Sequence, residues 1–235
     1  MTAPVITLDG PGGAGKGTLA AALAQELGWA LLDSGALYRV VGWQAEQKGL
    51  SAEDAAAVAE MAVAARALNI TFASVDGGRA LRVYCGDREV TTAIRSDQVS
   101  AAASRWAAVP EIRTALLARQ RAFRVPPGLI ADGRDMGTVV FPHAPLKLFV
   151  TASAKERARR RYAQLHAGEV LSDVQDNAIL RRIYEEILER DQRDASRSTS
   201  PLKPAADAIT IDTTGETVVA SLTRVRDFIR QKGWL

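Results

Sequence analysis

A glycine-rich segment near the N-terminus has the composition and spacing of a phosphate-binding loop. It follows the short apolar run 5–8 and reads Gly10-Pro11-Gly12-Gly13-Ala14-Gly15-Lys16-Gly17-Thr18. Glycines let backbone N–H groups converge on phosphate oxygens, because no Cβ stands in the way. Lys16 can reach the β- and γ-phosphates of a nucleotide, and a helix predicted to begin near it directs its positive end at the same anion.

The residue after the lysine departs from the usual form of this loop. Ser or Thr commonly follows the lysine as a Mg²⁺ ligand, whereas this chain has Gly17 there and Thr18 one place later. We therefore expect no dedicated protein metal site, with Mg²⁺ held mainly by phosphates and water, because this ion dehydrates reluctantly. The form Gly-Lys-Gly-Thr is typical of nucleoside monophosphate kinases. The sequence has no clear Asn-Lys-x-Asp guanine signature, which disfavours a switch GTPase.

Charged residues elsewhere indicate a second anion site, suited to a small phosphorylated acceptor. Arg39 closes the segment 33–39, which directly follows the second apolar run, and Asp132 ends the third run. An aspartate at the end of such a strand resembles a position that organises Mg²⁺. Arg190, Asp194 and Arg197 would share one helix face if the helix continues that far. Each group also has a purely structural interpretation, as a surface arginine, a polar turn or a self-neutralising surface row.

Five positive charges fall within seven residues after the fourth apolar run: Lys155, Arg157, Arg159, Arg160 and Arg161. These side chains could clamp the phosphates of ATP during transfer. The alternatives are a solvated basic helix face and a nucleic acid contact. No RNA-binding signature accompanies the cluster, and few aromatic residues are near that could stack on bases. We therefore expect a phosphate clamp and no nucleic acid partner.

Short apolar runs alternate with helical patterns along most of the chain. Strands are predicted over 5–8, 30–32, 129–131, 146–150 and 208–211. Helices are predicted over about 16–27, 36–48, 97–106, 110–123, 173–191 and 218–229, with further helices opened by a Ser51/Asp54 capping box and by Ser153. This alternation predicts a parallel sheet with helices on both faces and ligands at the carboxyl ends of its strands. Alternating residues around the turns at 76–78 and 86–87 predict a small antiparallel insertion.

Composition sets further limits on the protein. Its 235 residues suffice for one domain with small insertions, and a net charge of +3 with a pI of about 9.2 suits an anionic ligand. The single cysteine, Cys85, has no disulfide partner and is expected to be a small buried hydrophobe. The isolated His143 and His166 suggest no metal or catalytic site. With no signal peptide or membrane span predicted, we expect a cytoplasmic monomer without a membrane partner.

The sequence resembles bacterial cytidylate kinases over essentially its whole length. The matching segments are 10–18, 32–39, 94–96, 130–142 and 189–194, and Gly12 stands where the family often has Ser. The resemblance implies a P-loop nucleoside monophosphate kinase fold in a single domain, 1–235. Its five-stranded parallel core would comprise about 1–63, 104–152 and 169–235. An antiparallel acceptor-binding insertion would span about 64–103 and a mobile helical lid about 153–168.

The resemblance also implies roles for individual residues. The CMP phosphate would be held by Arg39, Arg134 and Arg197. Cytosine would be surrounded by Ser34, Ser104, Arg113 and Asp135, and the ribose would contact Arg190 and Asp194. We expect ATP to contact residues 10–18 together with Arg157 and Arg161. The catalytic residues would be Lys16, Arg134 and Arg197.

The chemistry that this arrangement implies is transfer of the γ-phosphoryl group of ATP to CMP or dCMP. The acceptor phosphate has a second pKa of ~6, so it is largely a dianion at neutral pH and needs no general base. Transfer requires two anionic phosphates in line, with their charge neutralised by Lys16, arginines and Mg²⁺. The alternatives are a kinase for UMP or another small phosphorylated acceptor, and an ATP-sensing binding protein. A sensor would not need the second, arginine-rich anion site.

Overall fold

The computed structural model describes residues 2–75, 80–166, 177–197 and 199–235. At its centre is a five-stranded sheet with the order β2 (Ala30–Asp33), β6 (Leu129–Gly133), β1 (Val5–Asp9), β7 (Leu146–Thr151) and β8 (Ile209–Asp212). All four strand pairs are parallel. The predicted α/β fold with a five-stranded parallel sheet is therefore confirmed, and each strand lies where an apolar run predicted one.

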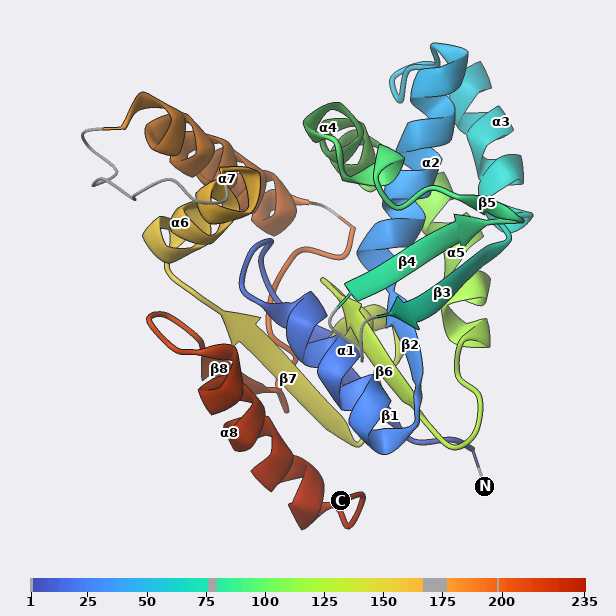
Figure 1. The fold of residues 1–235 in the computed structure, drawn as a ribbon. Helices are drawn as coiled ribbons and strands as arrows, with labels where there is room; N and C mark the ends of the chain where they lie inside the picture. Colours follow the sequence, from blue (N-terminus) through green and yellow to red (C-terminus); the bar gives the residue numbers. More distant parts are fainter. Residues whose placement is uncertain (1, 76–79, 167–176, 198) are drawn as a thin grey trace.

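Helices cover both faces of this sheet (Figure 1). Ile6 and Leu8 of β1 pack in a core with α1 (Lys16–Leu27) and α8 (Val218–Gln231), whereas Val5 packs on the opposite side. That second core includes α2 (Ser34–Lys48), α3 (Ala55–Arg66), α4 (Asp97–Trp106) and α5 (Pro110–Ala122). Successive strand residues point to opposite faces, so two covered faces explain the continuously apolar strands.

The small antiparallel sheet predicted from the turn-rich stretch is also present. It has the order β3 (Ile70–Val75), β4 (Ala80–Cys85) and β5 (Arg88–Glu89), and the 3₁₀ turn η2 (Ala93–Arg95) leads from it into α4. Phe72 packs on Phe123 after α5, with ring centroids 5.5 Å apart. Cys85 is half-buried against the same core, and this burial raises the pKa of its thiol.

Two more helices, α6 (Ala154–Leu165) and α7 (Ala178–Ser196), pack together through Ala158, Tyr162, Leu180 and Ile183. Figure 1 shows this pair at the upper left and α2 with α4 at the upper right, on either side of the carboxyl end of the sheet. No helix in the described parts of the chain is long and apolar enough to cross a membrane.

Several helix boundaries differ from the predictions. The cap of α3 is Asp54, which accepts from the Ala56 N–H, while Ser51 pairs with Glu53 outside the helix, so the predicted capping box is wrong. Helix α2 begins directly after β2, because Asp33 accepts from the Ala36 N–H. Helix α7 continues to Ser196, further than predicted. The start predicted for it, at 173, and the end of the expected lid, 167–168, lie outside the described residues.

Candidate active site

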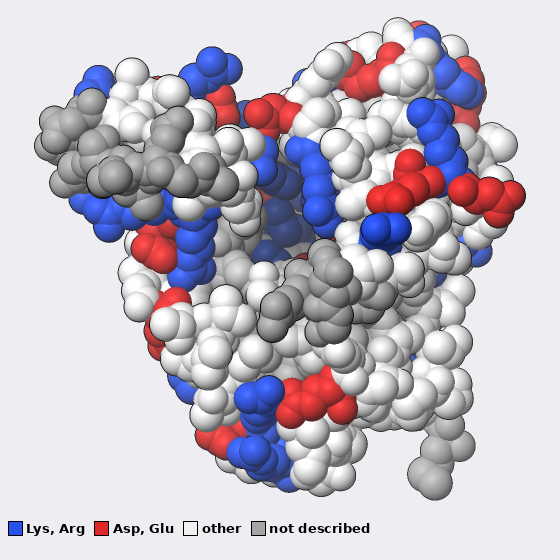
Figure 2. Space-filling view, viewed as in Figure 1, with Lys and Arg blue, Asp and Glu red and all other residues white. Residues whose placement is uncertain are grey.

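A cavity of about 670 Å³ opens at the carboxyl ends of β1, β2 and β6. Figure 2 shows Lys and Arg side chains gathered inside this hollow. Its walls include residues 12–18 of the glycine-rich loop. They also include all nine residues expected around the acceptor: Ser34, Arg39, Ser104, Arg113, Arg134, Asp135, Arg190, Asp194 and Arg197. The structure thus brings one anion-binding loop and one arginine-rich cluster into the same cavity.

The glycine-rich loop directs the N-terminus of α1 into the cavity. Gly10 has φ 144°, and a Cβ there would lie 1.9 Å from the Val150 carbonyl oxygen, so the turn requires glycine. No acidic side chain occupies the first turn of α1, which leaves its positive end available to an anion. Lys16 is only 5% exposed and donates from Nζ to the Pro11 carbonyl at 2.7 Å. Burial, followed by the charge of Arg134, lowers the pKa of Lys16 to about 8.

The other arginines of the cavity have more hydrogen-bond donors than the nearby carboxylates can accept. Asp194 pairs with Arg134 at 2.9 Å and with Arg197 at 2.5 Å. Burial acts to raise the pKa of Asp194, but these arginines lower it overall. Burial and the neighbouring Arg134 lower the pKa of Arg190 to about 10. Among the described residues, the buried Nε atoms of Arg39 and Arg190 have no hydrogen-bond partner. An anionic ligand would satisfy these donors.

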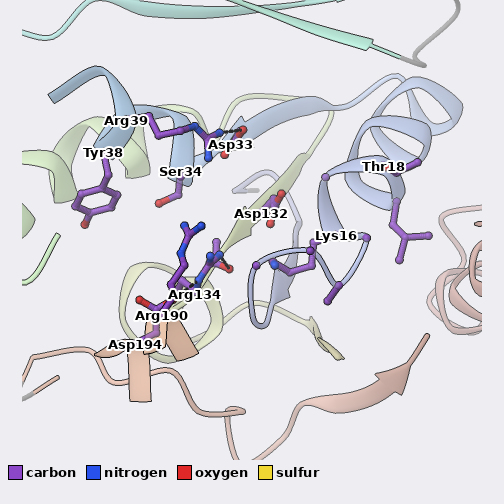
Figure 3. Close-up of a pocket in the computed structure, with 18 of the residues that line it drawn as sticks. Lys16, Thr18, Asp33, Ser34, Tyr38, Arg39, Asp132, Arg134, Arg190 and Asp194 are labelled. Carbon is purple, nitrogen blue, oxygen red and sulfur yellow. Dashed lines mark hydrogen bonds and ion pairs between the residues drawn. The ribbon is translucent and has the colours of Figure 1, made fainter. Parts of the chain in front are cut away.

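A second part of this wall has the character of a recognition pocket. Asp135 is buried and pairs with Arg113, which also donates to the Ala107 carbonyl at 3.0 Å. The Arg113 guanidinium lies 5.5 Å from the ring centroid of Tyr38, whose pKa burial raises to about 12. Figure 3 shows Tyr38, Ser34 and Arg39 projecting from α2 on one side, with Arg134, Arg190 and Asp194 facing them. Charged and neutral donors and a carboxylate acceptor therefore surround one volume.

Asp132 lies between the two anion-binding regions (Figure 3). It is the penultimate residue of β6 and lies beside Gly17, where a Cβ would be 3.5 Å from Asp132 Oδ2. Burial raises the pKa of Asp132 to about 6, although the nearby Lys16 acts to lower it. In the described parts of the chain, no group of three or more His, Cys, Asp or Glu side chains is placed to hold a metal ion.

Comparison with known proteins decides the family. A family model described as cytidylate kinase matches residues 6–231. A protein named cytidylate kinase from Pseudomonas aeruginosa (strain UCBPP-PA14) is 51% identical over 231 residues, which is 98% of this chain and 97% of that protein. A cytidylate kinase from Stutzerimonas stutzeri (strain A1501) is 51% identical over 222 residues, covering 94% and 93%. This chain belongs to the cytidylate kinase family. Membership places it among the nucleoside monophosphate kinases, which are phosphotransferases.

The basic helix of this cytidylate kinase family member, α6, distributes its arginines in different directions. Arg157 is buried, with carboxylate contacts to Asp191 at 3.0 and 2.5 Å and a contact to the Gly12 carbonyl at 3.2 Å. Arg161 turns to α4, where it pairs with Asp97 at 2.6 Å. Arg160, which belongs to the predicted phosphate clamp but was not among the individually predicted ATP contacts, lines the main cavity and contacts Thr213. Thus Arg157 and Arg161, the two lid arginines expected to bind ATP, each have a carboxylate partner in this structure.

Sequence reasoning also missed supporting residues around the acceptor region. Gln120 donates to Ser34 Oγ at 2.8 Å, although 86 residues separate the two. Asp9 accepts from the N–H groups of Met136 and Gly137 at 2.8 and 2.7 Å. Burial raises the pKa of Asp9 to about 7, while these two hydrogen bonds act to lower it. One sequence feature could have drawn attention to Asp9, since it is an acidic residue between an apolar strand and the glycine-rich loop. No feature of the sequence distinguishes Gln120.

Proposed function

We propose that this protein transfers the γ-phosphoryl group of ATP to CMP, and also to dCMP, producing ADP and CDP or dCDP. The observation that carries the proposal is the single cavity in which the glycine-rich loop faces a cluster of arginines with unsatisfied buried donors. A phosphotransferase for nucleotides must hold two polyanions close together, and each wall supplies cations for one of them. The relatives at about 50% identity that carry the name cytidylate kinase support CMP as the acceptor.

The proposed arrangement needs no catalytic base. The loop 12–18, which includes Lys16, binds the β- and γ-phosphates of ATP. The acceptor phosphate is bound by Arg39, Arg134 and Arg197. The acceptor is already largely dianionic near pH 7, because its second pKa is ~6. The protein's work is therefore to align the two phosphates and to neutralise the charge that develops between them. Arg134 and Arg197 are held for this by their common partner Asp194.

The base is proposed to bind beside Asp135, Arg113 and Ser34. A carboxylate accepts a hydrogen bond from the exocyclic amino group of cytosine, whereas uracil presents a carbonyl oxygen at that position. Ser104, whose buried hydroxyl has no partner among the described residues, adds a group that can donate or accept. The ribose is assigned to Arg190 and Asp194.

Mg²⁺ is proposed to enter with ATP and to be coordinated mainly by phosphate oxygens and water. The donor set fits this description, because Asp132 is a half-buried carboxylate near Lys16 and Gly17 and can orient such waters. When bound, the ion neutralises charge on the transferring phosphoryl group. Residues 64–103 are proposed as the acceptor-binding insertion, and α6 with the residues around it as a lid.

A coupled assay of ADP formation tests this function. ATP and Mg²⁺ are held constant while CMP, dCMP, UMP and AMP are compared as acceptors. We expect the highest kcat/KM for CMP or dCMP. A preference for UMP or AMP would identify a different acceptor, and ATP binding without ADP formation for any acceptor would favour the ATP-sensing class.

A further inference from the structure

Asp9 connects two parts of the molecule that belong to different substrates. It is the last residue of β1, and the glycine-rich loop begins directly after it at Gly10. Its carboxylate reaches across to the chain segment after β6, accepting from Met136 N–H through Oδ1 and from Gly137 N–H through Oδ2. These two residues immediately follow Arg134 and Asp135, which line the acceptor side of the cavity.

The position of Asp9 itself is tightly fixed. In the register of the sheet it lies between Gly133 of β6 and Phe149 of β7. The turn that follows is equally constrained, since Gly10 has φ 144° and no room for a side chain against Val150. Asp9 is only 5% exposed. A carboxylate held in this way is a rigid reference point for whatever it binds.

The segment that Asp9 binds has an unusual backbone. Residues Met136–Val140 form a single π-helical turn, η3, in which Phe141 N–H donates to the Met136 carbonyl at 2.7 Å. Such turns are rare and their first N–H groups lack partners within the turn. The Asp9 carboxylate supplies acceptors for two of them. Asp135 stands at the cap position of this turn, but its own side chain makes no capping bond and pairs with Arg113 instead.

Close packing leaves little freedom for an alternative arrangement. A Cβ on Gly137 would lie 2.9 Å from Thr7 Oγ1, 3.1 Å from Lys147 Cδ and 3.3 Å from Asp9 Oδ2. Glycine at 137 therefore permits the approach of the backbone to the carboxylate. If Asp9 loses one of its acceptor oxygens, a buried N–H group is left without a partner, and the turn must shift to find another.

We propose that Asp9 is a positioning residue for the acceptor: its carboxylate fixes the segment 134–137, and thereby holds Arg134 and Asp135 where they meet the nucleoside monophosphate. The proposal rests on the function proposed above for those two residues. Asp9 does not touch the substrate. Its removal is therefore expected to impair use of the acceptor much more than use of ATP, although Asp9 is adjacent in sequence to the ATP-binding loop.

Asp9→Asn tests this with the smallest change of shape. Asn keeps one acceptor oxygen but places an NH₂ donor against the other backbone N–H. We expect kcat/KM for the acceptor to fall by about ten- to a hundredfold, since a displacement of about 1 Å in a positioned group has effects of this size. KM for ATP is expected to change far less. Hydrogen exchange of the peptide that covers 134–140 should become faster in the substrate-free variant.

Gly137→Ala probes the same contact from its other side. The added methyl group must displace the side chain of Thr7, of Lys147 or of Asp9 itself, so this variant should reproduce the selective loss of acceptor use. Val225→Ala is the stability control, because it opens a cavity under α8, which contributes none of the proposed acceptor residues. It should lower Tm without changing the ratio of kcat/KM for the acceptor to kcat/KM for ATP.

The outcomes separate this proposal from the function on which it rests. All kinetics use the monophosphate that the wild type phosphorylates best, so a preference for an acceptor other than CMP or dCMP would contradict the proposed substrate and leave the test of Asp9 intact. If Asp9→Asn lowers kcat/KM for the acceptor and kcat/KM for ATP by equal factors, the positioning role is overturned. A lowered Tm with unchanged kinetics would also overturn it and would reduce Asp9 to a cap that only stabilises the fold. Unchanged exchange over 134–140 would overturn it too, because Asp9 would then not be holding this segment.

Discussion

Asp135 and Arg113 form a buried ion pair across 22 residues of sequence. Arg134, the immediate neighbour of Asp135, pairs instead with Asp194. Two adjacent residues of one segment thus belong to two different ion-pair systems: Asp135 lies beside Tyr38 and Arg113, and Arg134 lies with the other arginines. The arrangement separates a carboxylate that can read a base from a guanidinium that can bind a phosphate.

Asp135→Asn should therefore alter base preference. The amide can donate as well as accept, so it should lower kcat/KM for CMP and narrow the ratio of CMP to UMP. One good base contact contributes about 1–3 kcal/mol of discrimination. The measurement is kcat/KM for both monophosphates in wild type and variant. Loss of activity toward CMP and UMP in the same proportion would exclude Asp135 as a base reader.

Asp194→Asn is the matched comparison, because it removes a carboxylate that pairs with Arg134 and Arg197 and is not assigned to the base. It should reduce kcat/KM for CMP and UMP by similar factors, since both share the phosphate and the ribose.

Lys16→Ala should greatly reduce the rate of phosphoryl transfer and leave the fold intact. Removal of one preorganised group that stabilises transition-state charge typically costs about 3–4 kcal/mol, or roughly 10²–10³ in rate. Lys16 donates within the protein to the Pro11 carbonyl, so the circular dichroism spectrum and a cooperative thermal transition are the checks on folding. A folded variant with near-normal kcat would contradict the assigned role.

The lowered pKa of Lys16 gives a prediction for pH dependence. Its value of about 8, against 10.5 for an unperturbed lysine, means that the ammonium loses its proton as the pH rises through about 8. Because only the charged form neutralises phosphate, kcat/KM for ATP should fall above that pH, and this ratio reports the free enzyme. Lys16→Arg retains its charge throughout, so any residual activity should lack the alkaline decline. A decline that persists in this variant would assign the titration to another group.

The same pKa shift affects stability with a definite sign. Folding disfavours the charged form of Lys16, so the folded protein loses the stability contributed by this group as the pH falls from about 10.5 toward 8. Lys16→Ala should remove this part of the pH dependence of unfolding.

The sequence was most informative where structure is local. The strands were predictable because a parallel sheet covered on both faces requires apolar runs, and the loop 10–18 because its glycines and lysine are consecutive. Of the residues proposed for the acceptor, Arg39 and Arg134 could be grouped because they follow strands that end at one edge, and Arg190, Asp194 and Arg197 because their spacing places them on one helix face. Resemblance to a family supplied their individual roles, which no spacing in the sequence defines.

The remaining features depend on packing between distant segments. Arg160 and Arg161 are neighbours with the same chemistry, and only the way α6 packs decides that Arg160 lines the cavity while Arg161 pairs with Asp97. The hydrogen bonds of Asp9 join it to Met136 and Gly137, which are 127 and 128 positions away in the sequence. The π-helical turn that it caps has no hydrophobic period of its own, so no pattern in 136–140 predicted it.

Helix α6 should behave as a lid and not as a nucleic acid site. Its arginines face the cavity, the glycine-rich loop and α4, so closure over two bound nucleotides would involve several of them at once. We expect hydrogen exchange across residues 155–166 to slow when ATP and CMP are both bound, and to slow less with either alone. Ordered phosphates between the two sides would add contacts that the free protein lacks.

Asp97→Asn supplies the control for this prediction, because it removes the charge that Arg161 pairs with on α4. The pair is largely exposed, so its loss should change stability by no more than about 1 kcal/mol. The variant should show faster exchange over 155–166 without ligands and recover protection when both nucleotides bind, since Arg161 is then free to contact phosphate. Tight RNA binding that weakens steeply with salt, together with no effect of nucleotides on this helix, would instead favour a nucleic acid site.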